Sequence, residues 1–307
     1  MSLLTTTARF LPEVVATAPA QNQAPGSSLF PRCANPGCTT GWLRLWRSHR
    51  APIFEGRWAC SGECTGELVR AAIEREMNGR SSGIQPHRVP IGLLLVQGGR
   101  ISPDQLRYAL DQQRRAEERT GQRILLGRWL VENGIVDEGE LTRILSAQWN
   151  CPVFSIAGCR PEEIVSALPR FLAETMGTVP VRMVRGRLLY LACSQRVDRS
   201  LAYGLERMSR LRVVAGVVRD PEFRTAQARY LAAEPPPTRI LEVASTAILA
   251  RALTRVVESE KPAEARLVRI HETWWLRIWR QGSRRSTLSA SAGVEDTLAR
   301  VGVDFGS

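Results

Sequence analysis

The chain has 307 residues, of which 44% are hydrophobic and 23% charged, and its formal net charge is +12. This length and composition indicate a globular protein of two or three small domains. No stretch approaches the roughly 18 unbroken apolar residues of a membrane span. Residues 1–20 have no basic start, and Glu13 interrupts their apolar part, so no secretory signal is expected. We therefore expect a cytoplasmic protein without a membrane span.

The basic charge is almost entirely arginine, because Lys261 is the only lysine among 42 basic residues. The arginines are scattered along the chain rather than gathered into one block. This favours a general compositional bias and a surface that also attracts anionic ligands. Binding to nucleic acid is the alternative that a basic chain leaves open.

The N-terminal part is predicted to contain a tail and a cysteine module. Residues 1–31 are rich in Ala, Pro, Gln and Ser, a composition typical of a flexible tail. In the module at 32–80, residues 41–47 and 54–58 alternate like the strands of a hairpin, and a helix is predicted from Thr65 onward. A turn, a hairpin and a helix in this order resemble a treble-clef zinc finger.

Four of the seven cysteines form two close pairs in this module. Cys33 and Cys38 bracket a Pro-Gly turn, and Cys60 and Cys64 precede or begin the predicted helix. Without a secretion signal, clustered cysteines indicate a metal rather than disulfides. Four thiolates bind Zn²⁺ tetrahedrally and leave no open position, so we predict a structural zinc site. The alternative is four unligated buried cysteines.

Residues 86–155 contain a tandem repeat with a period of 35 residues. Seven positions correspond between the two copies: Gly92 with Gly127, Leu95 with Leu130, Gly99 with Gly134, Ile101 with Val136, Leu106 with Leu141, Leu110 with Leu145 and Gln113 with Gln148. Seven matches at one spacing are hard to obtain by chance.

Each copy predicts a helix-turn-helix hairpin. Its first helix carries apolar residues such as Ile91 or Leu126 and ends at a glycine suited to left-handed backbone. Its second helix begins with a capping-box pattern, Ser102 to Gln105 in the first copy, and continues an apolar stripe of leucines. Neither copy can bury its stripe alone, so we expect the two to pack together.

The remainder is predicted to be mixed α/β. In the subdomain at 156–233 we expect strands at 178–182, 187–193 and 211–218 and helices at 199–209 and 221–232. After a proline-rich linker, residues 238–307 predict a helix at 239–259, strands at 266–271 and 273–280, and a polar end. Trp275 and Trp279 share one face of that hairpin, and we expect them to pack against the preceding helix.

The repeat resembles the paired motif Arg-Leu-Gly-x2-Leu-x3-Gly-x-Leu-x4-Leu-x3-Leu-x2-Gln. This motif belongs to the N-terminal, or MshEN, domain of type II secretion and type IV pilus assembly ATPases. The resemblance covers about residues 86–232, since the strand pair around Val179 and Arg187 is also similar. Part of that family binds cyclic di-GMP. The resemblance therefore implies a nucleotide site formed by Arg88, Ile91, Gly92, Leu95, Gly99, Leu106, Leu110, Gln113, Arg123, Leu126, Gly127, Leu130, Gly134, Leu141, Leu145 and Gln148.

Two features depart from the family's pattern. Pro90 and Leu125 stand where its cyclic di-GMP binders have arginine, and the spacer after Gln113 is longer. Arg88 and Arg123 lie four residues before the motif glycines and could offer guanidinium groups to a phosphate or guanine instead. The alternative is that the repeat only packs and these arginines are surface residues.

The sequence gives no sign of catalysis. A P-loop needs a lysine before Ser or Thr, and Lys261 precedes a proline, so these residues encode no ATPase of this class. His49, His87 and His271 are far apart and fit neither a triad nor a metal spacing. We expect a protein that is not an enzyme.

The sequence thus predicts an α+β multidomain fold: a four-cysteine zinc finger, a helical tandem repeat packed with a small α/β subdomain, and a C-terminal helix plus β-hairpin. The first functional hypothesis is a non-catalytic adaptor or regulator that docks to a protein of a secretion, pilus or signalling assembly, with cyclic di-GMP as its implied ligand. The alternative is an arginine-rich zinc-finger protein that binds nucleic acid.

Overall fold

The computed structural model describes residues 33–39, 52–79, 88–121, 124–194, 197–280 and 293–302, all of which belong to one compact unit, Arg32–Ser307. The tail predicted at 1–31, the strand predicted at 41–47, and Arg123, His49 and His87 lie outside the described residues. The α+β multidomain class predicted from the sequence is confirmed, including a cysteine cluster near the N-terminus.

The larger sheet joins the two ends of the described chain. Its six strands are β1 (Ile53–Phe54), β2 (Arg57–Trp58), β6 (Thr238–Val243), β7 (Glu264–Ile270), β8 (Thr273–Trp279) and β9 (Val294–Val301), in the order β2-β1-β7-β8-β9-β6. Phe54 pairs in parallel with Ala265, and the Glu55 N–H donates to the Ala265 carbonyl at 2.7 Å. The cysteine module and the C-terminal region therefore share one sheet.

Two predictions for the C-terminal region are corrected by this sheet. The helix predicted at 239–259 is a strand, β6, up to Val243, and α9 (Thr246–Glu260) begins only after Ser245, whose hydroxyl caps the Ile248 N–H. The polar end, for which the sequence predicts no strand, contains β9, which lies between β8 and β6. Only Ala244 and Ser245 separate the strand from the helix, and no Gly or Pro marks the change of periodicity, which explains the first error.

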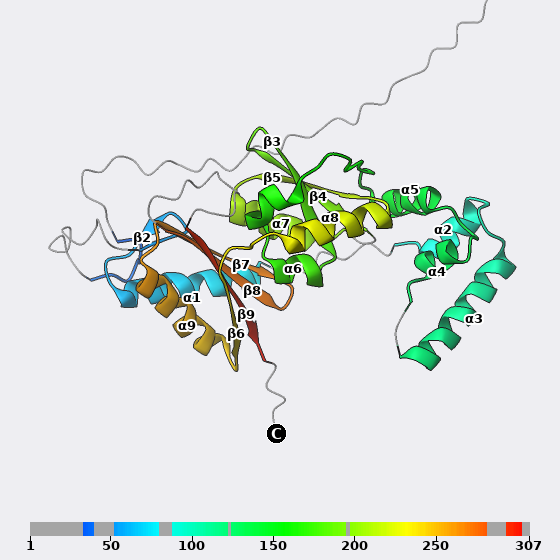
Figure 1. Ribbon diagram of the computed structural model, residues 1–307. Helices are drawn as coiled ribbons and strands as arrows, with labels where there is room; N and C mark the ends of the chain where they lie inside the picture. Colours follow the sequence, from blue (N-terminus) through cyan, green and yellow to red (C-terminus); the bar gives the residue numbers. More distant parts are fainter. Residues whose placement is uncertain are drawn as a thin grey trace, which may run out of the picture. The chain divides into compact units, whose positions relative to one another are not determined.

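Helices cover one face of this sheet. The helix α1 (Gly62–Asn78) and α9 contact each other along it, as Figure 1 shows. Their leucines, among them Leu68 and Leu253, share an apolar core with Trp274 and Leu276 of β8. The cysteine module is therefore stabilised by an apolar core that extends well beyond its own residues.

The opposite face packs against the α/β subdomain. That subdomain contains the 3-10 helix η2 (Pro161–Ala167), α6 (Arg170–Thr175), β3 (Thr178–Val184), β4 (Leu188–Cys193), α7 (Arg199–Ser209), β5 (Arg212–Val217) and α8 (Asp220–Ala232). Its strands form a second sheet in the order β3-β4-β5. Trp275 and Trp279 belong to this core and not to that of α9, so their predicted packing is wrong. The reason is that β8 is a central strand buried on both faces, whereas a hairpin on a helix would have only one buried face.

The tandem repeat forms four helices: α2 (Ile91–Gln97), α3 (Pro103–Thr120), α4 (Leu126–Glu132) and α5 (Glu138–Trp149). Gly99 and Gly134 follow the two short helices with φ of 64° and 66°, the left-handed backbone that the sequence predicts. Within the described part of the chain, no helix is both long and apolar enough to cross a membrane.

Candidate functional site

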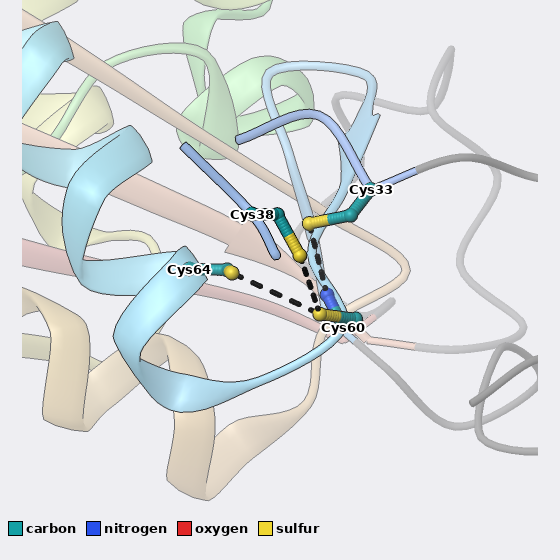
Figure 2. A group of neighbouring side chains, drawn as sticks. All are labelled: Cys33, Cys38, Cys60 and Cys64. Carbon is teal, nitrogen blue, oxygen red and sulfur yellow. Dashed lines mark hydrogen bonds between the residues drawn. The ribbon is translucent and has the colours of Figure 1, made fainter. Parts of the chain in front are cut away.

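The four cysteines of the N-terminal module converge on one point (Figure 2). Their sulfur atoms all lie within 4.8 Å of one another, with 3.4 Å between Cys38 and Cys60 and 3.8 Å between Cys60 and Cys64. A tetrahedral Zn²⁺ with Zn–S bonds of about 2.3 Å requires sulfur atoms about 3.8 Å apart. The observed separations bracket this value, so the four thiols are close enough to hold one metal ion.

Local structure positions each cysteine pair. The Cys38 N–H donates to the Asn35 carbonyl at 3.1 Å and closes the turn between the first two cysteines. Ser61 caps α1, so Cys64 lies in the first helical turn, as the sequence predicts. Burial raises the pKa of the Cys60 thiol to about 12, which means that a bound cation is needed to keep this sulfur deprotonated.

The two glycines of the repeat allow close contact between its helices. A Cβ on Gly92 would lie 2.6 Å from Leu106 Cδ1, and one on Gly127 would lie 3.0 Å from Leu141 Cδ1. The same glycine–leucine pair therefore closes the hairpin in each copy. The next pair of corresponding leucines differs in burial. Leu145 is buried against the three-stranded sheet, whereas Leu110 is 41% exposed because the middle of α3 has no such neighbour. The first copy thus fails to bury the stripe predicted for it.

The motif glutamines link the two copies reciprocally. The Gln148 amide donates to the Val89 carbonyl at 2.8 Å, and the Gln113 amide donates to the Ile124 carbonyl. Each glutamine thus bonds to the opposite copy, at the carbonyl three residues before the motif glycine of that copy. This exchange gives both glutamines a role in packing, whether or not a ligand binds.

A cavity of about 770 Å³ lies among the four repeat helices and the start of α8. Eight of the predicted nucleotide-site residues line it: Ile91, Leu110, Gln113, Leu126, Gly127, Leu141, Leu145 and Gln148. The other described ones do not. Leu95 and Leu130 are fully buried in the core of the repeat, while Gly92, Gly99, Leu106 and Gly134 shape the helix contacts and turns.

Arg88 is also absent from the cavity wall. Its guanidinium lies 3.8 Å from the centre of the Trp149 ring and donates to the Gln148 carbonyl at 2.9 Å. It therefore supports the C-terminal end of α5, where a cation is favourable. Arg88 is half-buried in this position, which differs from the surface residue of the alternative.

The cavity contains two cations that the sequence did not predict, Arg128 and Arg224. Arg128 pairs with Glu132 and Arg224 with Asp220, each at 2.6 Å. Glu138 is a third carboxylate in the lining, so two arginines and three carboxylates give it a formal charge of −1. Arg128 directly follows a motif glycine and could have been noticed, whereas Arg224 comes from α8 and only the tertiary fold brings it here. A dianionic ligand would have to displace both carboxylates.

Comparison with known proteins agrees with part of the predicted relationship. No protein-family model matches the chain. A stretch of 104 residues is 34% identical to the type IV pilus assembly ATPase PilB of Myxococcus xanthus (strain DK1622). This stretch is 34% of the chain, but it spans only 17% of that relative. A solved structure of MshE with cdg is 25% identical, with 47% of this chain and 99% of that chain covered and a TM-score of 0.36. Similarity in sequence to a pilus assembly ATPase is thus established for about a third of the chain.

Proposed function

We propose that the chain is a non-catalytic cytoplasmic regulator or adaptor that docks to a protein of a pilus or secretion assembly. The tandem repeat carries this proposal, because its motif is the one that resembles the N-terminal domain of pilus assembly ATPases. The similarity to PilB over 104 residues supports it. The four-cysteine cluster would hold a structural Zn²⁺ that fixes the start of α1.

The surface of the repeat offers a place for docking. Five large apolar side chains of the repeat region are 41% to 59% exposed: Val89, Leu93, Tyr108, Leu110 and Leu125. Leu110 and Leu125 also line the cavity among the repeat helices. Exposed apolar side chains mark an interaction surface where they form one contiguous patch. Docking here would use the residues that the first copy leaves unburied.

Site-specific crosslinking tests the adaptor role. A photoreactive amino acid placed at Leu93 or Tyr108 of the full chain should capture a pilus or secretion protein in the native cell. The control is the same replacement at Ile248, which is 39% exposed on α9. Equal capture at Ile248, or capture only of unrelated proteins, would reject the docking surface.

The proposed ligand of the cavity is cyclic di-GMP. The support is the eight motif positions in its wall and a volume within the range of roughly 300–1,000 Å³ of small-molecule sites. The phosphates would have to replace the carboxylate partners of Arg128 and Arg224, so binding should be weak and sensitive to those two residues. Calorimetry with the full chain should show heat that is lost in Arg128→Gln with Arg224→Gln and kept in Arg107→Gln, whose guanidinium lies on the exposed face of α3. Absence of heat at high ligand concentration removes the nucleotide from the proposal and leaves the adaptor role standing.

A further inference from the structure

Positive charge is concentrated at one end of the small sheet. Residues 182–212 contain eight arginines and two carboxylates, a formal +6 that is half of the chain's net +12. Five of these arginines lie at or beside the strand ends there and are exposed, and we call them the arginine end: Arg182, Arg185, Arg187, Arg210 and Arg212. The scattered appearance of arginine in the sequence conceals this cluster.

Strand pairing brings these side chains together. The chain turns from β3 into β4 at Arg185, and β4 runs parallel to β5 with Leu188 opposite Arg212. Parallel strands begin at the same end of a sheet, so the turn and the start of β5 are neighbours. The Arg212 N–H donates to the Arg187 carbonyl at 2.9 Å, and Arg210 ends α7 just before β5.

Both carboxylates of this stretch are engaged with other groups. Asp198 accepts from the Leu201 N–H at 2.9 Å and contacts His271 Nε2 at 2.5 Å. Glu206 accepts from the Val213 N–H at 2.8 Å. Neither carboxylate pairs with the arginine end, so the positive charge there is not neutralised by its own segment.

The five arginines differ from most others that the structure describes. Within the described ranges none of the five has an ion-pair partner, whereas Arg207 on the same helix α7 pairs with Glu76. Arg185 and Arg210 also have φ of 51° and 59°. Glycine or asparagine takes up this left-handed backbone at lower cost, so the backbone does not explain an arginine at either position. The Arg210 guanidinium reaches toward the β1–β2 turn, where a Cβ on Gly56 would lie 3.8 Å from its Nη2.

We propose that the arginine end binds the phosphate backbone of a nucleic acid. Guanidinium groups bind phosphate oxygens in a bidentate manner, and several of them on one surface can contact successive phosphates. This activity is additional to the docking role and does not depend on it.

Two observations favour a polynucleotide over a membrane surface. In the described segments 182–188 and 209–214, no large apolar side chain is exposed, and surface attachment to lipid usually adds such groups to the basic ones. Tyr203, two helical turns before Arg210 on α7, is 61% exposed, and an exposed ring can stack on an unpaired base. A single strand, whose bases are unpaired, is therefore the form of nucleic acid chosen for the test.

Fluorescence anisotropy of the full chain with a labelled, mixed-sequence single-stranded DNA tests the proposal. Each phosphate contact contributes about −0.7 to the slope of log K against log salt, so five contacts predict a slope of about −3.5. The variant Arg182→Gln, Arg187→Gln, Arg212→Gln avoids the two left-handed positions. It should bind about 100-fold more weakly at roughly 0.1 M salt, and its slope should fall to about −1.4.

A matched control has the same change in net charge. The variant Arg107→Gln, Arg115→Gln, Arg119→Gln alters three exposed arginines of α3 and should bind nearly as well as the wild type. If the first triple variant does not fold, Arg185→Asn with Arg210→Asn suits the left-handed backbone and should weaken binding about 25-fold.

Three results would overturn the proposal. The first is no binding by the wild type at low salt. The second is equal weakening in the α3 control, which would show that only overall charge attracts the DNA. The third is binding to vesicles of phosphatidylserine and phosphatidylcholine that the single-stranded DNA does not compete away, which would assign the surface to a membrane.

Discussion

Asp296 offers the sharpest test of how the larger sheet is held against the α/β subdomain. Its carboxylate is fully buried and accepts three bonds of 2.7 Å each: two from Nε and Nη2 of Arg277 and one from the Trp275 indole N–H. Arg277 is only 2% exposed and faces the Ala167 carbonyl of η2 at 3.5 Å. The substitution Asp296→Asn keeps the shape of this side chain but presents an N–H₂ donor to a guanidinium donor.

The expected loss follows from the buried charge that remains. Removing one partner of a buried ion pair costs about 3–5 kcal/mol, and two charge-assisted hydrogen bonds at about 1.5–3 kcal/mol each give a similar value. We expect Asp296→Asn to lower the free energy of unfolding by about 3–5 kcal/mol. The control Asp104→Asn breaks the exposed pair with Arg107 and should cost less than about 1 kcal/mol.

A double variant separates the pair from the packing around it. Arg277→Met with Asp296→Leu removes both charges, and apolar replacement of a buried pair is often neutral. The Trp275 N–H loses its acceptor, which costs about 1–3 kcal/mol, so about half of the loss should be recovered. Urea denaturation followed by circular dichroism measures all four proteins. A double variant no more stable than Asp296→Asn, or a single variant as stable as Asp104→Asn, would refute the reasoning.

Three further outcomes are expected. Glu76→Gln should destabilise the chain by about 2–3 kcal/mol in urea, because this buried carboxylate accepts from Arg207 and the backbone of β7, whereas Glu67→Gln on the exposed face of α1 should have almost no effect. Atomic emission should find one zinc per chain, and Cys64→Ser should lose the zinc and lower the melting temperature; a folded wild type without zinc would contradict this. Burial raises the pKa of the Cys193 thiol to about 11, so the unfolded chain loses this proton first and the free energy of unfolding should fall between about pH 9 and 11. Cys193→Ala should flatten that fall in urea midpoints measured across the same pH range.

Local features of the chain could be predicted because short-range chemistry determines them. The period of 35 placed both helical hairpins, and Ser102 with Gln105 forms the full capping box expected. In the second copy only one half of the capping box forms. Asp137 caps α5, but the Glu140 side chain pairs with Arg100 at 2.8 Å instead of bonding back to the backbone of Asp137. The convergence of the four cysteines could also be predicted, since metal-ligand spacing is visible in a sequence.

Contacts between distant segments could not be predicted in the same way. No periodicity shows that the hairpin at β1 extends a sheet whose other strands come roughly 200 residues later. The same limit applies to the cavity, where Arg224 approaches from α8, and to the arginine end, which is assembled by the parallel pairing of β4 with β5. Burial on both faces of β8 likewise depends on a subdomain that its own sequence does not specify.

The shared sheet determines the order in which parts of the chain can fold during synthesis. The ribosome releases the cysteine module long before β7 and α9, so the apolar side of α1, including Leu68 and Val69, has no partner while the next domains emerge. Metal held by the four cysteines would keep the first turn of α1 in place during that interval. Any fragment that ends near residue 233 would reproduce this immature state, with an open sheet edge and an uncovered helix. Experiments on the N-terminal half should therefore supply residues 238–302 as a second polypeptide.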